Sequence, residues 1–242
     1  MKKFLLSFLL AWVSFHALAN LSSDACSDQD IVLILDCSGS ITQVGFDSIK
    51  NYAKRFVRDN QSTLVTKRFA VISVGTIVRL DHGFSNQQYI DNVLNSISAL
   101  SYRGGGSPIK DAFDIALDQF TRYSSPTKGK ILIISDGKPN SSEQDPCANS
   151  TISQEISSLS VEVKMIGVNP SQTILCVLDY NPGNIYSLTS YDQLTTFTTD
   201  IFPVAQPDLD GDGTCDSFDE CIEPSGNCDD DFVTEMGLVK IE

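Results

Sequence analysis

The chain has 242 residues, 31 of them acidic and 17 basic, and a formal net charge of −14 at pH 7. This balance argues against a basic surface for nucleic acid, so no nucleic-acid partner is expected. The length suffices for one sizeable hydrophobic core with a short appendage.

The first segment has the features of a secretory signal. Residues 1–19 begin with two lysines, continue through the apolar run FLLSFLLAWVSF and end on Ala17-Leu18-Ala19. This order of charge, apolar run and small residues is typical of a cleaved signal peptide. An uncleaved anchor is the alternative, but it needs about 20 apolar residues. We therefore expect a secreted, extracellular chain without a transmembrane segment.

Short apolar runs alternate with helical patterns between residues 30 and 202. The predicted strands are 31–36, 69–75, 131–135 and 161–168, with 77–82 as an antiparallel edge strand. Apolar stripes predict helices over 46–57 and 109–120, and capping boxes at 85–88 and 190–193 open helices over 89–97 and 194–201. This alternation predicts an α/β fold: a doubly wound, mostly parallel six-stranded sheet with helices on both faces.

Polar side chains follow several of the predicted strands. Asp36 and Asp136 end two of them, Ser38 and Ser40 come directly after Asp36, and a glycine-rich loop ends at Ser107. The carboxyl ends of parallel strands share one rim, so these oxygens should meet there. Oxygen donors of this kind favour a hard cation such as Mg²⁺ or Mn²⁺.

These motifs carry a family resemblance. Asp36-Cys37-Ser38-Gly39-Ser40 resembles the DxSxS motif of von Willebrand factor type A domains, and the loop ending at Ser107 and the segment 134–137 resemble the second and third motifs of that family. The resemblance implies a metal-ion-dependent adhesion site built from Asp36, Ser38, Ser40, Ser107 and Asp136. Its Mg²⁺ or Mn²⁺ would bind an Asp or Glu carboxylate of an extracellular protein ligand, and in some members the last helix, here 191–202, shifts on binding. The family usually has Thr where Ser107 stands.

Other interpretations of the same residues stay open. Ser107 before Pro108 is also a good helix N-cap. A nucleophilic enzyme would have to pair Cys37 with His82, but a thiol in an apolar setting beside a carboxylate is a poor nucleophile. We therefore expect no enzyme, and a secreted adhesion or matrix-recognition protein is favoured. The alternative is a structural matrix component whose metal sites only stabilise it.

The amino-acid composition changes after Pro203, so we place the main domain at 20–205 and an acidic tail at 206–242. Residues 208–242 contain twelve acidic residues and one basic residue. The spacing DxDxDGxxDxxD fits a calcium loop, and with the following cysteine it resembles a thrombospondin type 3 repeat. The predicted Ca²⁺ ligands are Asp208, Asp210, Asp212, Thr214, Asp216 and Asp219. A solvated, disordered acidic end is the alternative for this segment.

Seven cysteines in an oxidising compartment predict disulfides with one free thiol. Cys37 is the candidate for the free thiol, because it follows a buried strand. Cys147 with Cys176 and Cys221 with Cys228 are candidate pairs, and Cys26 could bond to the tail. Glycosylation sequons stand at Asn60, Asn140 and Asn149.

Overall fold

The computed structural model describes residues 29–60, 67–85, 89–123, 129–148, 151–170, 172–198 and 201–202. These residues belong to one compact unit that spans residues 27–205. The predicted signal peptide, the calcium ligands of the tail, Cys26, Cys221, Cys228 and Asn149 lie outside the described residues. No described helix combines the length and apolar character needed to cross a membrane.

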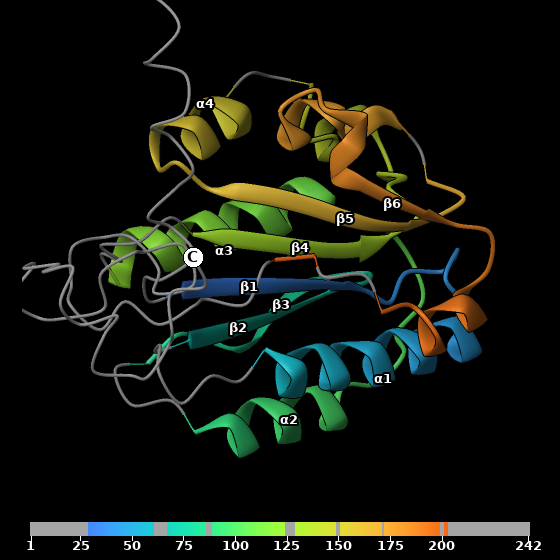
Figure 1. The fold of residues 1–242 in the computed structure, drawn as a ribbon. Helices are drawn as coiled ribbons and strands as arrows, with labels where there is room; N and C mark the ends of the chain where they lie inside the picture. The colour runs from blue at the N-terminus through green and yellow to red at the C-terminus, as the bar shows by residue number, and fades with distance from the viewer. Residues whose placement is uncertain are drawn as a thin grey trace, which may run out of the picture. The chain divides into compact units, whose positions relative to one another are not determined.

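A six-stranded sheet forms the middle of the fold, with the order β3-β2-β1-β4-β5-β6 (Figure 1). Its strands are β1 (Gln29–Asp36), β2 (Lys67–Val74), β3 (Val78–His82), β4 (Lys130–Ser135), β5 (Glu162–Val168) and β6 (Ile185–Leu188). Only β3 is antiparallel to its neighbour, and it lies at an edge. The predicted mixed, doubly wound sheet is confirmed, although β6 was not located in the sequence.

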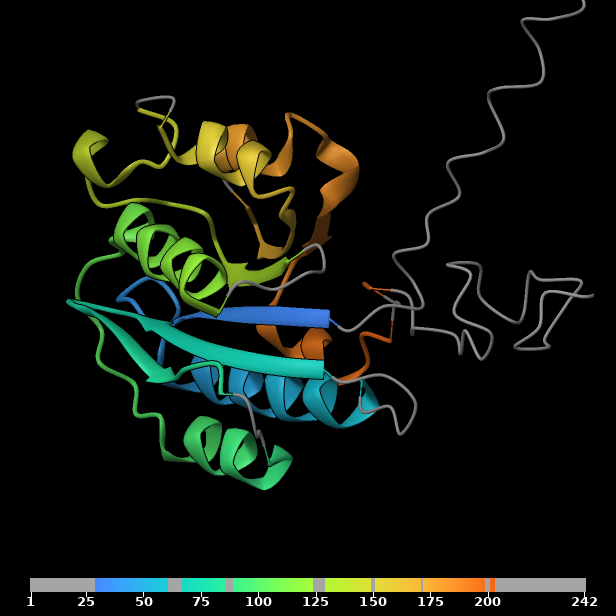
Figure 2. The same cartoon turned by 90° about the vertical axis from the view of Figure 1, so that its left-hand side faces the viewer.

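Helices cover both faces of the sheet, as the edge-on view shows (Figure 2). The helices are α1 (Gln43–Asp59), α2 (Ile90–Ala99), α3 (Ile109–Tyr123) and α4 (Thr151–Ser158). Helices α1 and α2 pack on one face, where Leu33 and Phe46 belong to the core, and α3 and α4 pack on the other, around Phe113 and Ile133. The central strand β1 is buried along its whole length, which explains its unbroken apolar run over residues 31–35.

The described part of the chain also contains the 3₁₀ helices η1 (Ser142–Gln144), η2 (Gln172–Leu178), η3 (Pro182–Asn184) and η4 (Tyr191–Thr195). The capping box at Ser190 is present, but the predicted last helix over 191–202 is wrong, because η4 ends at Thr195. The guanidinium of Arg55 in α1 donates hydrogen bonds to the carbonyl oxygens of residues 194, 195 and 197. A side chain of α1 therefore binds the carbonyl groups at the end of η4 and just after it.

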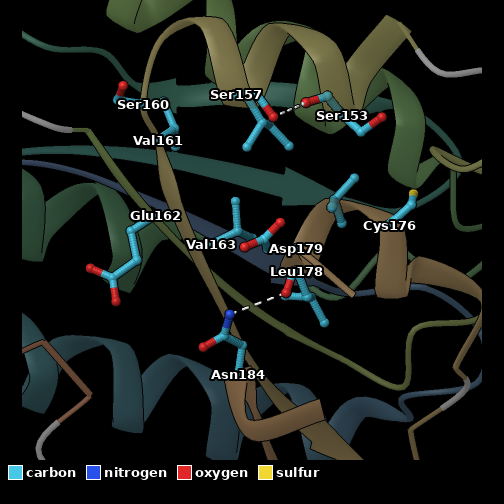
Figure 3. Close-up of a pocket in the computed structure, with 12 residues that line it drawn as sticks. Ser153, Ser157, Ser160, Val161, Glu162, Val163, Cys176, Leu178, Asp179 and Asn184 are labelled. Carbon is cyan, nitrogen blue, oxygen red and sulfur yellow. Dashed lines mark hydrogen bonds between the residues drawn. The ribbon is translucent and has the colours of Figure 1, made fainter. Parts of the chain in front are cut away.

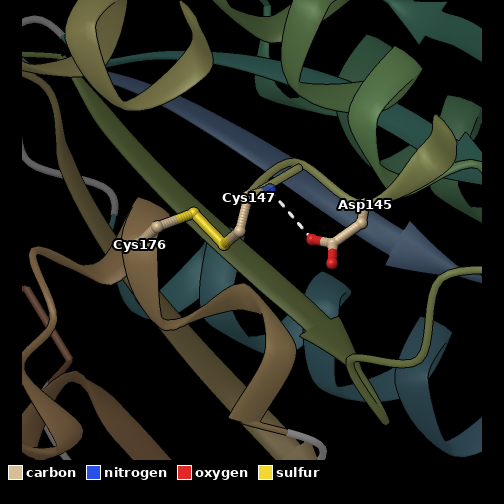
Figure 4. The surroundings of a disulfide bond; sticks show 3 residues. All are labelled: Asp145, Cys147 and Cys176. Atoms are coloured by element: carbon tan, nitrogen blue, oxygen red, sulfur yellow. Dashed lines mark hydrogen bonds between the residues drawn. A yellow bond between two sulfur atoms is a disulfide. The ribbon is translucent and has the colours of Figure 1, made fainter. Parts of the chain in front are cut away.

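The disulfide between Cys147 and Cys176 is formed, and it ties the segment after β4 to η2 (Figure 4). The backbone N–H of Cys147 donates to Asp145 Oδ1 at 2.8 Å, which fixes the turn that carries the sulfur. Cys37 is a free, buried thiol, as predicted. The two strand-rim loops that carry Cys147 and Cys176 therefore meet in space.

Two of the sequons differ in exposure. Asn60 is buried, and its Nδ2 donates to the carbonyl oxygen of Phe56 at 3.0 Å. Since a glycan is attached at that nitrogen, this conformation does not present Asn60 for modification. Asn140 is exposed, so it is the described sequon that a glycan could reach.

Candidate metal centre

The candidate site begins at the carboxyl end of β1. Asp36 is only 1% exposed, and its Oδ1 accepts a hydrogen bond from the backbone N–H of Ser38 at 2.9 Å. Its Oδ2 accepts from the hydroxyl of Ser135 at 2.5 Å and from that of Ser107 at 3.4 Å. One buried carboxylate thus collects donors from three segments that are far apart in the sequence.

The turn after Asp36 places two further hydroxyls at the rim. Ser38 is buried and Ser40 is exposed, and their Oγ atoms lie 3.2 Å apart. Between them, the N–H of Gly39 donates to the carbonyl of Gly105 at 2.8 Å. A Cβ on Gly39 would lie 3.1 Å from that carbonyl oxygen, so glycine allows the two loops to approach this closely.

The glycine-rich loop is held on both sides before it reaches Ser107. The N–H of Gly104 donates to the carbonyl of Cys37 at 3.0 Å, and the carbonyl of Gly104 accepts from the N–H of Thr76 at 3.2 Å. Gly104 and Gly105 have φ values of 61° and 76°, in the left-handed region that glycine tolerates best. Ser107 is 3% exposed, and its hydroxyl faces Asp36, which is compatible with the predicted ligand role.

The third segment follows β4. Asp136 is 5% exposed, and its Oδ1 accepts from the N–H of Lys138 at 3.2 Å. The ammonium of Lys138 lies 3.7 Å from Asp136 Oδ2, but that side chain is 60% exposed. Gly137, at φ 68°, donates its N–H to Ser135 Oγ at 2.9 Å. The turn after β4 is therefore held by hydrogen bonds from its backbone to the side chains of Ser135 and Asp136.

The structure thus brings together the segments that carry all five predicted residues. It also adds Ser135, which was not predicted from the sequence. Ser135 forms a short hydrogen bond to Asp36, because Leu35 pairs with Ile134 in adjacent parallel strands. The sequence signal was the serine directly before the Asp-Gly pair. Its role depends on the register between β1 and β4, which the sequence does not specify.

The electrostatics of the site favour a cation. Burial raises the pKa of Asp36, hydrogen bonds from Ser135 and Ser38 partly oppose this, and the negative charge of Asp136 is a smaller cause that also raises it. Burial also raises the pKa of Tyr191 in η4, with the charges of Asp136 and Asp36 as lesser causes. Among the residues that the structure describes, the only ion pair of these two carboxylates is the one from Asp136 to the exposed Lys138, so burying both negative charges is costly. A hard divalent cation would offset this charge, so the residues present fit such an ion.

The residues of the enzyme alternative do not form a reactive pair. Burial raises the pKa of the Cys37 thiol, which disfavours the thiolate that a nucleophile needs. His82 lies on β3 opposite Val71, whereas Cys37 donates its N–H to the carbonyl of Val74. The Nδ1 of His82 is within 3.3 Å of Ser96 Oγ. The Cys37 thiol and the His82 imidazole therefore do not share neighbouring residues that would place them together as a reactive pair.

Comparison with known families agrees with this geometry. The model of the von Willebrand factor type A domain matches residues 30–200, which include all three motif segments. The chain belongs to the von Willebrand factor type A domain family. The resemblance drawn from the motifs is therefore confirmed at the level of the family and its fold.

Several known proteins are similar over part of this domain. Bovine vitrin is 27% identical over 118 residues, which make up 48% of this chain and 18% of vitrin. Human vitrin is 25% identical over 118 residues. The mouse sushi, von Willebrand factor type A, EGF and pentraxin domain-containing protein 1 is 26% identical over 129 residues, with 4% of its length covered. This chain therefore spans less than a fifth of these relatives.

Among solved structures, proximal thread matrix protein 1 from the mussel byssus has a similar fold. The TM-score is 0.58 at 19% identity, and the match covers 71% of this chain and 46% of the mussel protein. A further structure of the mussel protein has a zinc-occupied MIDAS motif. At this level of identity the likeness concerns the fold alone.

Proposed function

We propose that this protein is a secreted adhesion or matrix-recognition protein that binds an acidic side chain of an extracellular partner through a divalent cation. The hydroxyls of Ser38, Ser40 and Ser107 would hold the ion, with Asp36 and Asp136 acting largely through water. Mg²⁺ or Mn²⁺ is the proposed ion, and it would supply an open position for the partner's carboxylate. The observation that carries the proposal is the buried Asp36 carboxylate, on which hydroxyls from two other segments converge.

Neutral hydroxyls suit this role. A hydroxyl contributes an oxygen without cancelling the charge of the ion, so the ion would keep a strong attraction for an anionic oxygen. The zinc-occupied MIDAS motif of the mussel matrix protein supports a divalent cation at this rim. The non-enzymatic character of the protein is part of the same proposal, since nothing in the arrangement requires a reactive nucleophile.

Recognition is favoured over a purely stabilising metal. Direct backbone hydrogen bonds already join the rim loops: Gly39 to Gly105, Gly104 to Cys37 and Thr76 to Gly104. A cation is not needed to hold these loops together. This supports a role for the ion in binding a partner, and the structural matrix component remains the alternative that the experiment below addresses.

The acidic tail is proposed as a separate calcium module. Its ligands would be Asp208, Asp210, Asp212, Thr214, Asp216 and Asp219, in the loop spacing that Ca²⁺ favours. Residues 1–19 are proposed as the cleaved signal peptide. Both proposals rest on the sequence alone.

Calorimetric titration of Mg²⁺ into the chelator-stripped chain tests the rim site. We expect a binding event that is lost in Asp136→Ala and kept in Asp91→Ala, a matched change of an exposed carboxylate on α2. Any binding to the tail is common to all three proteins and cancels in the comparison. Equal heats for the wild type and Asp136→Ala would refute the site. Metal-dependent stabilisation without binding to a surface of immobilised acidic peptides would favour the structural alternative.

A further inference from the structure

A pocket lies between α4, η2 and the N-terminal end of β5 (Figure 3). The candidate metal centre is at the opposite, carboxyl-terminal edge of the sheet, so the two are separate. The pocket has a volume of about 240 Å³. Pockets for drug-sized ligands measure roughly 300–1,000 Å³, so this one is suited to a single side chain or a ligand of similar size.

The floor of the pocket is apolar and its rim is polar. Ile156, Val161, Val163, Val177 and Leu178 line it and are buried. Ser153, Ser157, Ser160, Glu162, Asp179 and Asn184 supply the polar part of the lining. No lysine or arginine lines it. A ligand that suits this lining has an apolar stem and a polar end that donates hydrogen bonds.

The two carboxylates of the lining differ in their partners. Glu162 forms an ion pair with Lys164, with Oε1 and Nζ 2.9 Å apart, and its carboxylate is turned away from the pocket (Figure 3). Asp179 is among the residues that line the pocket (Figure 3). Asp179 is exposed and forms no ion pair with any residue that the structure describes. It is therefore an anion without a counter-ion at the edge of an apolar floor.

Several side chains of the lining form bonds within the elements that surround the pocket. The hydroxyl of Ser157 donates to the carbonyl of Ser153 at 2.9 Å, and Asn184 Nδ2 donates to the carbonyl of Leu178 at 3.1 Å. The disulfide at Cys176 holds η2 in place. The pocket is thus bounded by α4, β5, the covalently tied η2 and, at Asn184, η3.

We infer that this pocket binds the alkylammonium end of a lysine side chain of a partner protein. The four methylene groups would lie on Ile156, Val161 and Val163, the apolar lining residues that keep some exposed surface, and the ammonium would pair with Asp179. A lysine places an apolar stem and a cationic end in this order, as the lining requires. Charge complementarity selects it over an acidic or a purely apolar side chain. This inference is independent of the metal centre.

The test is an NMR titration of the uniformly ¹⁵N-labelled chain with Nα-acetyl-lysine amide, whose side-chain ammonium is free, in 150 mM NaCl. N-acetyl-norleucine amide is the matched probe, because it has a similar stem and lacks the ammonium. We expect saturable shifts at the amides of Val163, Leu178 and Asn184, with about fivefold weaker binding of the norleucine probe. Fivefold corresponds to the upper range of a solvent-accessible ion pair.

Two variants complete the test. Asp179→Asn should weaken the lysine probe about fivefold, and asparagine tolerates the positive φ of 55° at this position. Glu155→Gln, on the same helix that borders the pocket but outside its lining, should leave affinity unchanged. Equal affinity of the two probes, an unaltered affinity in Asp179→Asn, or shifts scattered over the surface would each overturn the inference.

Discussion

The glycine-rich loop offers a sharp test of how the rim is built, because two adjacent glycines differ in their surroundings. An ideal Cβ on Gly105 would lie 2.1 Å from Thr76 Oγ1 and 3.1 Å from its Cβ. A Cβ on Gly104 would meet nothing closer than 3.6 Å, the hydroxyl of Tyr102. Both residues have left-handed φ values, so alanine has a comparable backbone cost at each position and a steric cost only at Gly105.

The expected magnitudes follow from these two terms. A left-handed non-glycine residue costs about 1–2 kcal/mol, and overpacking adds about 1–3 kcal/mol. Gly104→Ala should therefore lower the free energy of unfolding by about 1–2 kcal/mol, and Gly105→Ala by about 2–5 kcal/mol. Gly105→Ala should also displace the loop that carries Ser107 and weaken Mg²⁺ binding by about 10- to 100-fold, as losses of supporting contacts at metal sites do.

Urea unfolding in chelator gives the stabilities, and calorimetric titration gives the Mg²⁺ affinities. The double variant with Thr76→Ala removes the hydroxyl at 2.1 Å and should recover part of the loss of Gly105→Ala while not improving Gly104→Ala. This coupling is what contact between Gly105 and Thr76 requires. Equal losses in Gly104→Ala and Gly105→Ala, or no rescue by Thr76→Ala, would refute the packing argument.

Three further perturbations test other parts of the molecule. Replacing Cys147 and Cys176 by alanine should lower stability by about 3.6 kcal/mol in urea, from a sequence separation of 29; no change in stability would show that the cross-link adds nothing. Arg55→Ala removes three hydrogen bonds to carbonyls within 194–197 and should cost about 2–3 kcal/mol, with faster amide exchange in that segment. Asp36→Asn should remove Mg²⁺-dependent stabilisation. Burial raises the folded-state pKa of Asp36 above 3.8, so its contribution to stability without metal is most favourable below 3.8 and is lost as pH rises through the folded value. In chelator, the stability of Asp36→Asn relative to wild type should therefore increase between pH 4 and pH 7, and a constant difference would contradict this.

The parts of the fold that the sequence predicted are those whose signal is local. Strands β1, β2 and β4 are covered on both faces and have nearly continuous apolar runs, whereas in β5 the half-buried Glu162 and Lys164 interrupt the run. Strand β6 was missed because its four residues are mostly half-buried at a sheet edge and carry no such run. Helix α4 buries only Ile152 and Ile156, too few positions to establish a period.

The last helix shows the limit of local signals most clearly. The capping box at Ser190 and Gln193 correctly marked a start, but the residues at and after the end of η4 bind Arg55, which is 139 positions or more away in sequence. Tyr52 adds to the same contact, with its ring 5.2 Å from the Arg55 guanidinium and 5.9 Å from the ring of Phe197. A capping box reports only on the first turn, so it contained no information about this contact.

At the candidate site, the motif residues were predictable and their supporting contacts were not. The family resemblance supplied Asp36, Ser38, Ser40, Ser107 and Asp136 as positions. The hydrogen bond from Ser135 to Asp36 depends on strand register, and the bond from Gly39 to Gly105 depends on two loops 66 residues apart meeting at one rim. Backbone contacts of this kind leave little trace in residue types beyond the glycines themselves.

The proposed cation would offset the repulsion between the negatively charged rim and an acidic partner. Near Asp36 and Asp136 the local charge is negative, with Lys138 mostly in solvent, so the rim without a cation repels an acidic partner. Binding a carboxylate at this rim therefore requires a short-range attraction that outweighs a long-range repulsion. A divalent ion held by neutral hydroxyls would supply that attraction, and added salt would screen the repulsion while leaving the coordinate bond little changed. Affinity for an acidic partner in saturating Mg²⁺ should then hold or rise with NaCl, whereas recognition through surface lysines alone would weaken.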